Sequence, residues 1–151
     1  MIIYLDTSAL AKLYHQEAGT AFVEELLSNA ESVFVSRLGV LEMHSVLAGK
    51  VRTRTVTQTY ADLMGRRFRS DVRKRRFRVV ALRSRHYDLA HSLVAAHGAA
   101  RGLRTLDSLQ LAVALDLARN GLVESLVASD KVLLKVATIE LIKCIDPEVG
   151  Q

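Results

Sequence analysis

Four carboxylates in this sequence stand where side chains from distant segments could meet: Asp6, Glu42, Asp107 and Asp130. Asp6 follows residues 2–5, a short apolar run that predicts a strand buried on both faces. Asp130 comes shortly after residues 126–128, a second run of the same kind. Because ligands of open parallel sheets bind beyond the carboxyl ends of the strands, both acids are expected at one such edge.

The other two acids are placed by predicted helices. Glu42 has Leu38 and Val46 one turn away on either side, and no Lys or Arg three or four residues distant. A carboxylate on such a face must be paired, metal-bound or protonated, because burying a bare charge is costly. Asp107 opens the helix predicted over residues 106–120. Each of the four acids also has a simpler explanation, as a helix cap, as a partner of a helix dipole or, for Glu42, as an exposed side chain.

Clustered carboxylates favour one kind of chemistry. Two unit charges about 4 Å apart repel by about 4 kcal/mol at an effective dielectric constant of about 20. Four of them would protonate or separate unless cations neutralised them. Ligands that are all oxygen favour Mg²⁺ or Mn²⁺ over Zn²⁺. Because a bound divalent cation lowers the pKa of its water and stabilises charge on phosphate, the acids point to phosphodiester hydrolysis.

The elements that must position these acids alternate along the chain. Apolar runs predict strands over residues 2–5, 33–35, 78–82, 126–128 and 139–145. Helical periodicity predicts helices over residues 8–14, 20–29, 36–50, 55–75, 84–101, 106–120 and 131–136, with Thr20 and Ser36 as caps. This order predicts a three-layer α/β/α sandwich with a mostly parallel central sheet. The length and the lack of a linker composition predict one domain over residues 1–151.

The composition limits where the protein works. Its single cysteine, Cys144, cannot form an internal disulfide and suits a reducing compartment. The sequence has no signal-peptide pattern and no uninterrupted apolar stretch of membrane-spanning length. We therefore expect a cytoplasmic protein without membrane contact.

Four segments, taken in order, resemble the motifs of a known family. They are residues 5–10, Leu41-Glu42 with its apolar helix, residues 106–112 and residues 128–133, and residues 12–19 resemble the family's continuation of the first motif. The chain resembles a PIN domain over essentially its whole length, and it is most similar to the VapC-type ribonuclease toxins of VapBC toxin–antitoxin modules. The resemblance implies a PIN-like nuclease fold, a metal-dependent endoribonuclease activity, an antitoxin bound over the acidic site and a homodimer.

Resemblance and chemistry together assign the roles. Asp6, Glu42 and Asp107 are expected as the core ligands of one or two Mg²⁺ or Mn²⁺ ions, with Asp130 as a fourth ligand, directly or through water. Thr7 and Ser129 are expected to supply hydroxyl groups that orient these ligands. We expect RNA as the substrate.

The basic residues are concentrated in one segment. Residues 50–85 hold 13 of the 21 Lys and Arg but only two of the 16 acids, a local charge of +11 against −6 for the remainder. This asymmetry predicts a contact with a polyanion, here RNA phosphates. The alternative is a solvated helix face. The candidate RNA-binding residues are Arg66, Arg67, Arg69, Arg73, Lys74, Arg75, Arg76 and Arg78.

Other functions stay open at this stage. The five histidines have no spacing that stacks them on one helical face, so a two-histidine ribonuclease has no support, and no glycine-rich phosphate loop occurs. Two alternatives fit the same motifs. One is a PIN-domain nuclease of RNA processing without an antitoxin. The other is a catalytically inactive PIN module that binds RNA or protein.

Overall fold

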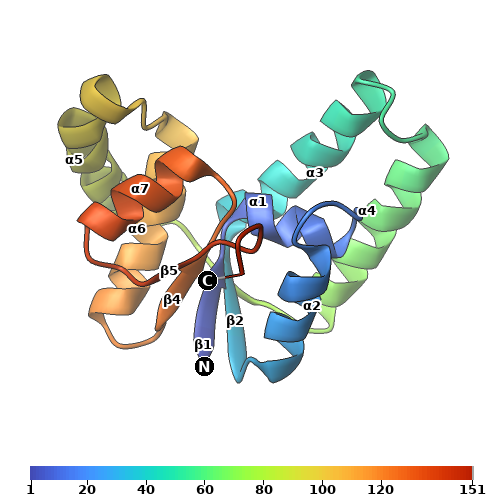
Figure 1. Cartoon of the computed structure of the whole chain (residues 1–151), viewed down its shortest axis with the longest axis horizontal. Coiled ribbons are helices and arrows are strands. Elements are labelled where there is room, and N and C mark those ends of the chain that lie inside the picture. Colours follow the sequence, from blue (N-terminus) through green and yellow to red (C-terminus); the bar gives the residue numbers. More distant parts are fainter. Residues whose placement is uncertain (151) are drawn as a thin grey trace.

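The computed structural model describes residues 1–150, which form a layered α/β fold around one parallel sheet (Figure 1). The strand order is β3-β2-β1-β4-β5, and every neighbouring pair is parallel. The strands are β1 (Ile2–Leu5), β2 (Ser32–Ser36), β3 (Arg78–Val80), β4 (Ser125–Val127) and β5 (Cys144–Ile145). The order places β1 in the centre, so the segments that follow β1, β2 and β4 emerge side by side at one edge.

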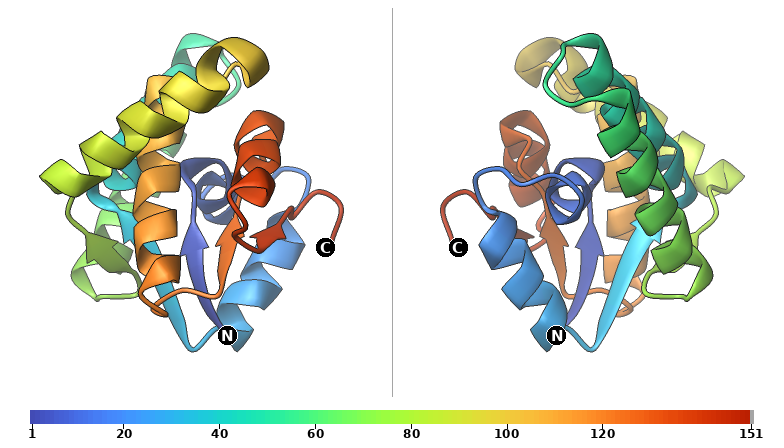
Figure 2. Two further views of the ribbon diagram at one scale, coloured as in Figure 1. Left: turned by 90° about the vertical axis from the view of Figure 1, so that its left-hand side faces the viewer. Right: turned by 90° about the vertical axis from the view of Figure 1, so that its right-hand side faces the viewer.

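Helices cover both faces of this sheet (Figures 1 and 2). One face is covered by α1 (Thr7–Leu10), the 3₁₀ turn η1 (Ala11–Leu13), α2 (Thr20–Asn29), α3 (Arg37–Arg52) and α4 (Gln58–Arg73). The other face is covered by α5 (Ser84–Arg101), α6 (Thr105–Arg119) and α7 (Lys131–Ile139). The predicted three-layer α/β/α sandwich is therefore confirmed, and the sheet is parallel throughout.

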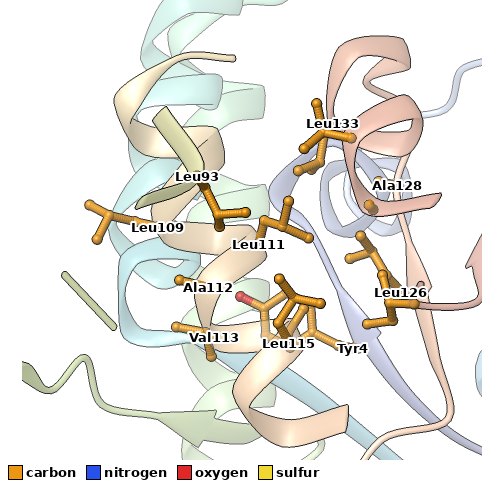
Figure 3. Close-up of a cluster of buried hydrophobic side chains, with 14 of the residues drawn as sticks. Tyr4, Leu93, Leu109, Leu111, Ala112, Val113, Leu115, Leu126, Ala128 and Leu133 are labelled. Carbon is orange, nitrogen blue, oxygen red and sulfur yellow. The ribbon is translucent and has the colours of Figure 1, made fainter. Parts of the chain in front are cut away.

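The two cores meet at β1, because side chains of a strand alternate between faces. Ile3 and Leu5 pack in the core beneath the α1–α4 layer, whereas Tyr4 packs in the core beneath α5, α6 and α7. Figure 3 shows Leu111 and Leu115 of α6 directed toward Tyr4 and the strand residue Leu126. The prediction that the first strand is buried on both faces is thus confirmed.

The C-terminal part differs from the sequence prediction. Residues 139–145 were expected to form the last strand, but α7 continues to Ile139 and only Cys144 and Ile145 pair with β4. The chain turns at Leu141, whose φ of 64° lies in the left-handed region and is incompatible with a strand. The apolar run reflects burial of Ile142 in the core rather than an extended backbone.

Smaller differences concern helix ends. The predicted first helix is a single turn, α1, that tightens into η1, and α4 begins only at Gln58, after the cap Thr57. Thr20 is the first residue of α2 rather than its cap, because Gly19 takes the cap position with φ of 84°. Ser36 caps α3 as predicted, accepting a hydrogen bond from the Gly39 N–H. No helix within residues 1–150 has the length and apolar character to cross a bilayer.

Candidate active site

Asp6 lies at the carboxyl end of the central strand and is almost fully buried, with 6% exposure. Its Oδ2 accepts hydrogen bonds from the Ser8 N–H (2.9 Å) and the Ser8 hydroxyl (2.6 Å), so Asp6 caps α1. Burial raises the pKa of this carboxyl to about 6, and the negative charge of Glu42 adds to the rise, although the hydrogen bonds from Ser8 oppose it. Asp6 therefore combines a capping role with an electrostatic cost that a cation would relieve.

Glu42 is held from α3 by two donors that come from other elements. Its Oε2 accepts hydrogen bonds from the Thr7 hydroxyl (2.7 Å) and from the Gln110 Nε2 (2.5 Å). The side chain is half-buried rather than fully buried as its apolar neighbours suggested. Its other oxygen, Oε1, makes no hydrogen bond to any residue within 1–150. Glu42 is thus oriented through one oxygen, and the other is available to a ligand.

Gln110 of α6 is the polar centre of this region, and its role was missed at the sequence level. Its Oε1 accepts hydrogen bonds from the Tyr4 hydroxyl and from the Ser36 hydroxyl (2.8 Å), and its Nε2 also donates to the Thr7 hydroxyl (2.9 Å). Gln110 is 1% exposed, and all of its hydrogen-bonding groups are used. The one available signal was a glutamine inside the apolar run 109–112.

Asp107 and Asp130 form a second pair through Arg104. The Arg104 Nε lies 3.1 Å from the Asp107 Oδ2, and its Nη2 lies 3.6 Å from the Asp130 Oδ2. Arg104 is largely exposed, so this bridge is a weak one. Asp130 also caps α7, accepting from the Leu133 N–H at 2.8 Å. The sequence did not single out Arg104.

Two hydroxyl groups were predicted beside the acids. The Thr7 hydroxyl contacts Glu42 directly, as described above. Ser129 instead donates its backbone N–H to the Ser8 hydroxyl (2.9 Å). The Ser129 hydroxyl is shielded from solvent and has no hydrogen-bond partner within residues 1–150.

The structure thus arranges the four acids as two pairs rather than as one ligand set. Asp6 and Glu42 are close enough to influence each other electrostatically, and Arg104 joins Asp107 to Asp130. Within residues 1–150, no three Asp, Glu, His or Cys side chains are close enough to hold one metal ion. The donor chemistry fits Mg²⁺ or Mn²⁺, because every candidate ligand is a carboxylate and Asp6 lies buried beside the negative charge of Glu42.

The basic segment presents its charges to solvent. All eight candidate RNA-binding residues are exposed, and within the described chain only Arg76 has an ion-pair partner, Asp71 at 3.1 Å. Arg66 and Arg69 line a groove of about 570 Å³ between α3 and α4. Phe68 and Phe77 are buried, so they are not available to stack on bases.

The histidines most enclosed by the fold are used structurally. His86 and His97 of α5 are 1% and 6% exposed. The Nε2 of His86 lies 3.0 Å from Asp116, and that of His97 lies 2.8 Å from Glu140. Each therefore forms a separate histidine–carboxylate pair on the α5–α7 side of the sheet.

A parallel sheet with carboxylates beyond its central strands defines an α/β protein whose site could hold divalent cations. The sequence matches the PIN domain family over residues 3–139, so this chain belongs to the PIN domain family. No curated protein sequence matches the chain.

Solved structures share the fold at low sequence identity. VapC20 of Mycobacterium tuberculosis, described as a toxin that cleaves the sarcin-ricin loop, is 18% identical, with a TM-score of 0.68 and 99% of both chains covered. FitAcB of Neisseria gonorrhoeae is 15% identical, with a TM-score of 0.68 and coverage of 96% of this chain and 97% of that chain. VapBC2 of Rickettsia felis, solved with a promoter DNA fragment, is 14% identical, with a TM-score of 0.62 and coverage of 97% and 98%.

Proposed function

We propose that this PIN domain is a metal-dependent endoribonuclease, the toxin of a type II toxin–antitoxin pair, with Asp6, Glu42, Asp107 and Asp130 as its catalytic carboxylates. One observation supports this most strongly. Thr7 and Gln110 hold Glu42 by one oxygen beside the buried Asp6, whose pKa is raised. A buried acid with a perturbed pKa is typical of functional sites.

In this proposal, some residues would hold the metal ions and others would orient those residues. Asp6, Glu42 and Asp107 would hold one or two Mg²⁺ or Mn²⁺ ions, and Asp130 would complete the set. When bound, such an ion supplies a water of lowered pKa and stabilises charge on the phosphate. Thr7 and Gln110 orient Glu42, because both donate to the same oxygen.

The RNA would be bound by charge and cleaved by water. The arginines of α4 and of the segment after it are exposed, and we expect them to contact phosphates through contacts that weaken as salt rises. Attack of water on phosphorus in line with the 3′-oxygen breaks the P–O3′ bond. The products carry a 5′-phosphate and a 3′-hydroxyl. The ribose 2′-hydroxyl takes no part.

The proposed partners follow from the solved relatives. The solved structures of FitAcB and VapBC2 each carry a name that joins two components. We propose by analogy a cognate antitoxin that covers the acidic site, a homodimer, and a single nuclease domain acting in the cytoplasm. A small open reading frame next to this one would support the toxin assignment over an RNA-processing nuclease.

The direct test is cleavage of a mixed-sequence RNA in Mn²⁺ and in EDTA, with the ends of the products examined. We expect cleavage only with the metal, and downstream fragments that ligate through their 5′ ends without kinase treatment. The Asp6→Asn and Glu42→Gln variants should be inactive, and Glu25→Gln, on the exposed face of α2, should be active. Cleavage that persists in EDTA would refute the metal mechanism. Binding without any cleavage would indicate the inactive module.

A further inference from the structure

A cavity of about 340 Å³ lies directly beside the candidate active site. Thr7 and Ser8 of α1 form part of its wall, and Ser129 and Asp130 form another part. Ser129 lines the cavity as a residue, and its hydroxyl, which lacks a hydrogen-bond partner within the described chain, is shielded from solvent. A strand of substrate that reaches the acids can therefore extend into this cavity.

Two lysines line the cavity, and one of them is buried. Lys12, in η1, is 2% exposed, and its Nζ donates to the Ala18 carbonyl (2.7 Å) and the Glu148 Oε1 (3.0 Å). Glu17 lies 3.5 Å from the same ammonium group and 3.2 Å from the Nζ of Lys50. A buried ammonium group needs anionic partners, since an unpaired buried charge is costly. The cavity therefore contains two cations that two carboxylates now neutralise.

Glu148 is the partner carried by the last described segment, and its side chain is partly exposed, at 36%. Its Oε2 also lies 3.7 Å from the Lys131 Nζ, and other contacts anchor the segment that carries it. The Lys131 Nζ lies 2.5 Å from the Asp146 Oδ2. Pro147 packs so closely on Gly19 that a Cβ added to Gly19 would lie 2.7 Å from the Pro147 carbonyl oxygen. Figure 2 shows this segment beside α2. Withdrawal of the Glu148 side chain does not require the backbone to detach.

We propose that Lys12 and Lys50 form a phosphate subsite for the RNA strand next to the cleaved bond, and that Glu148 occupies this subsite in the RNA-free protein. The inference rests on the proposed function, because it takes RNA as the substrate. Acids at the cleavage site repel the phosphates of a polyanion, so cations are needed immediately beside them. Lysine provides a compact charge that suits a phosphate oxygen. Because the buried Lys12 needs an anionic partner, a phosphate that displaces Glu148 supplies the same charge compensation.

The test measures binding of a fluorescent 12-nucleotide single-stranded RNA of mixed sequence, in EDTA so that no cleavage occurs, over a range of salt. Lys50→Gln should weaken binding about three- to tenfold and reduce the slope of log affinity against log salt by about 0.7, the loss of one phosphate contact. Glu148→Gln should tighten binding about two- to fivefold, because the competing carboxylate is gone. Lys50 is the better test than Lys12, whose substitution would also disturb folding.

Matched controls separate local from general charge effects. Lys143→Gln and Glu25→Gln change the same charges at exposed positions that make no side-chain ion pair within residues 1–150. Both should leave RNA binding nearly unchanged. If Lys50→Gln behaves like Lys143→Gln, the subsite is refuted, and carboxylates of a protein partner become the better occupants. If Glu148→Gln fails to tighten binding, the competition is refuted. Failure of the proposed function would show differently, as wild-type protein that does not cleave RNA in Mn²⁺.

Discussion

Replacing Asp6 with Asn removes one buried negative charge while keeping the shape of the side chain. The pKa of Asp6 is raised to about 6 from an ordinary value of 3.8, chiefly by burial and further by Glu42. The folded protein thus binds this proton more tightly than the unfolded chain does. The free energy of unfolding therefore falls as the pH rises from about 4 to above 6. One pKa unit corresponds to about 1.4 kcal/mol, so the ionised carboxylate costs up to about 3 kcal/mol near pH 7.5.

We therefore expect Asp6→Asn to be more stable than the wild type in EDTA at pH 7.5, by up to about 3 kcal/mol, or about 6–12 °C in Tm. The helix cap survives, because the amide oxygen can accept the two hydrogen bonds from Ser8. At pH 5 the gain should fall to about half, since Asp6 is then largely protonated in the folded protein. Mn²⁺ should stabilise the wild type and leave the variant unchanged.

Thermal and urea unfolding with and without Mn²⁺, at both pH values, measure these differences. Asp6→Ala is the control, because it removes the charge and the helix cap together. Its gain in stability should be smaller than that of Asp6→Asn. If the Tm of Asp6→Asn in EDTA is equal to or lower than that of the wild type, capping by the charged form outweighs repulsion. Equal stabilisation of both proteins by Mn²⁺ would show that Asp6 is not a ligand.

Three further predictions concern the surrounding network. Gln110→Met removes the acceptor of the buried Tyr4 and Ser36 hydroxyl groups and should lower the free energy of unfolding by about 2–4 kcal/mol in urea titrations; a loss below about 1 kcal/mol would contradict its central role. Arg104→Ala removes a competing cation from two acids, so calorimetric titration should show Mn²⁺ binding about two- to fivefold tighter, not weaker. Arg85, with His86, lowers the pKa of Asp116 in the folded protein. The ionised carboxyl therefore stabilises the fold at pH values above the pKa that it has in the unfolded chain, and this stabilisation is lost as the carboxyl is protonated in acid. The stability deficit of Asp116→Asn should accordingly shrink as the pH falls below about 4, and a constant deficit would refute the ion pair.

Much of the fold was accessible from local sequence, because each element buries its apolar residues with its own period. The run of residues 2–5 predicted the central strand, and α5 begins and ends where its periodicity placed it. The last strand was predicted too long, because only Ile142 and Ile145 of this run are buried and the left-handed turn at Leu141 separates α7 from β5. Apolar character alone does not distinguish a strand from a turn that carries apolar side chains.

The residues that could do chemistry, and the family they resemble, can be read from the order of residues, because carboxylates after strand ends are visible there. How these groups meet depends on the folded chain. Gln110 is 68 residues from Glu42, and Glu148 is 136 residues from Lys12, yet each pair is in hydrogen-bond contact. Such contacts depend on strand order and helix packing, so no local periodicity or spacing contains them. The separation of the acids into two pairs is likewise a balance of repulsion, burial and the reach of Arg104, which exists only in the folded chain.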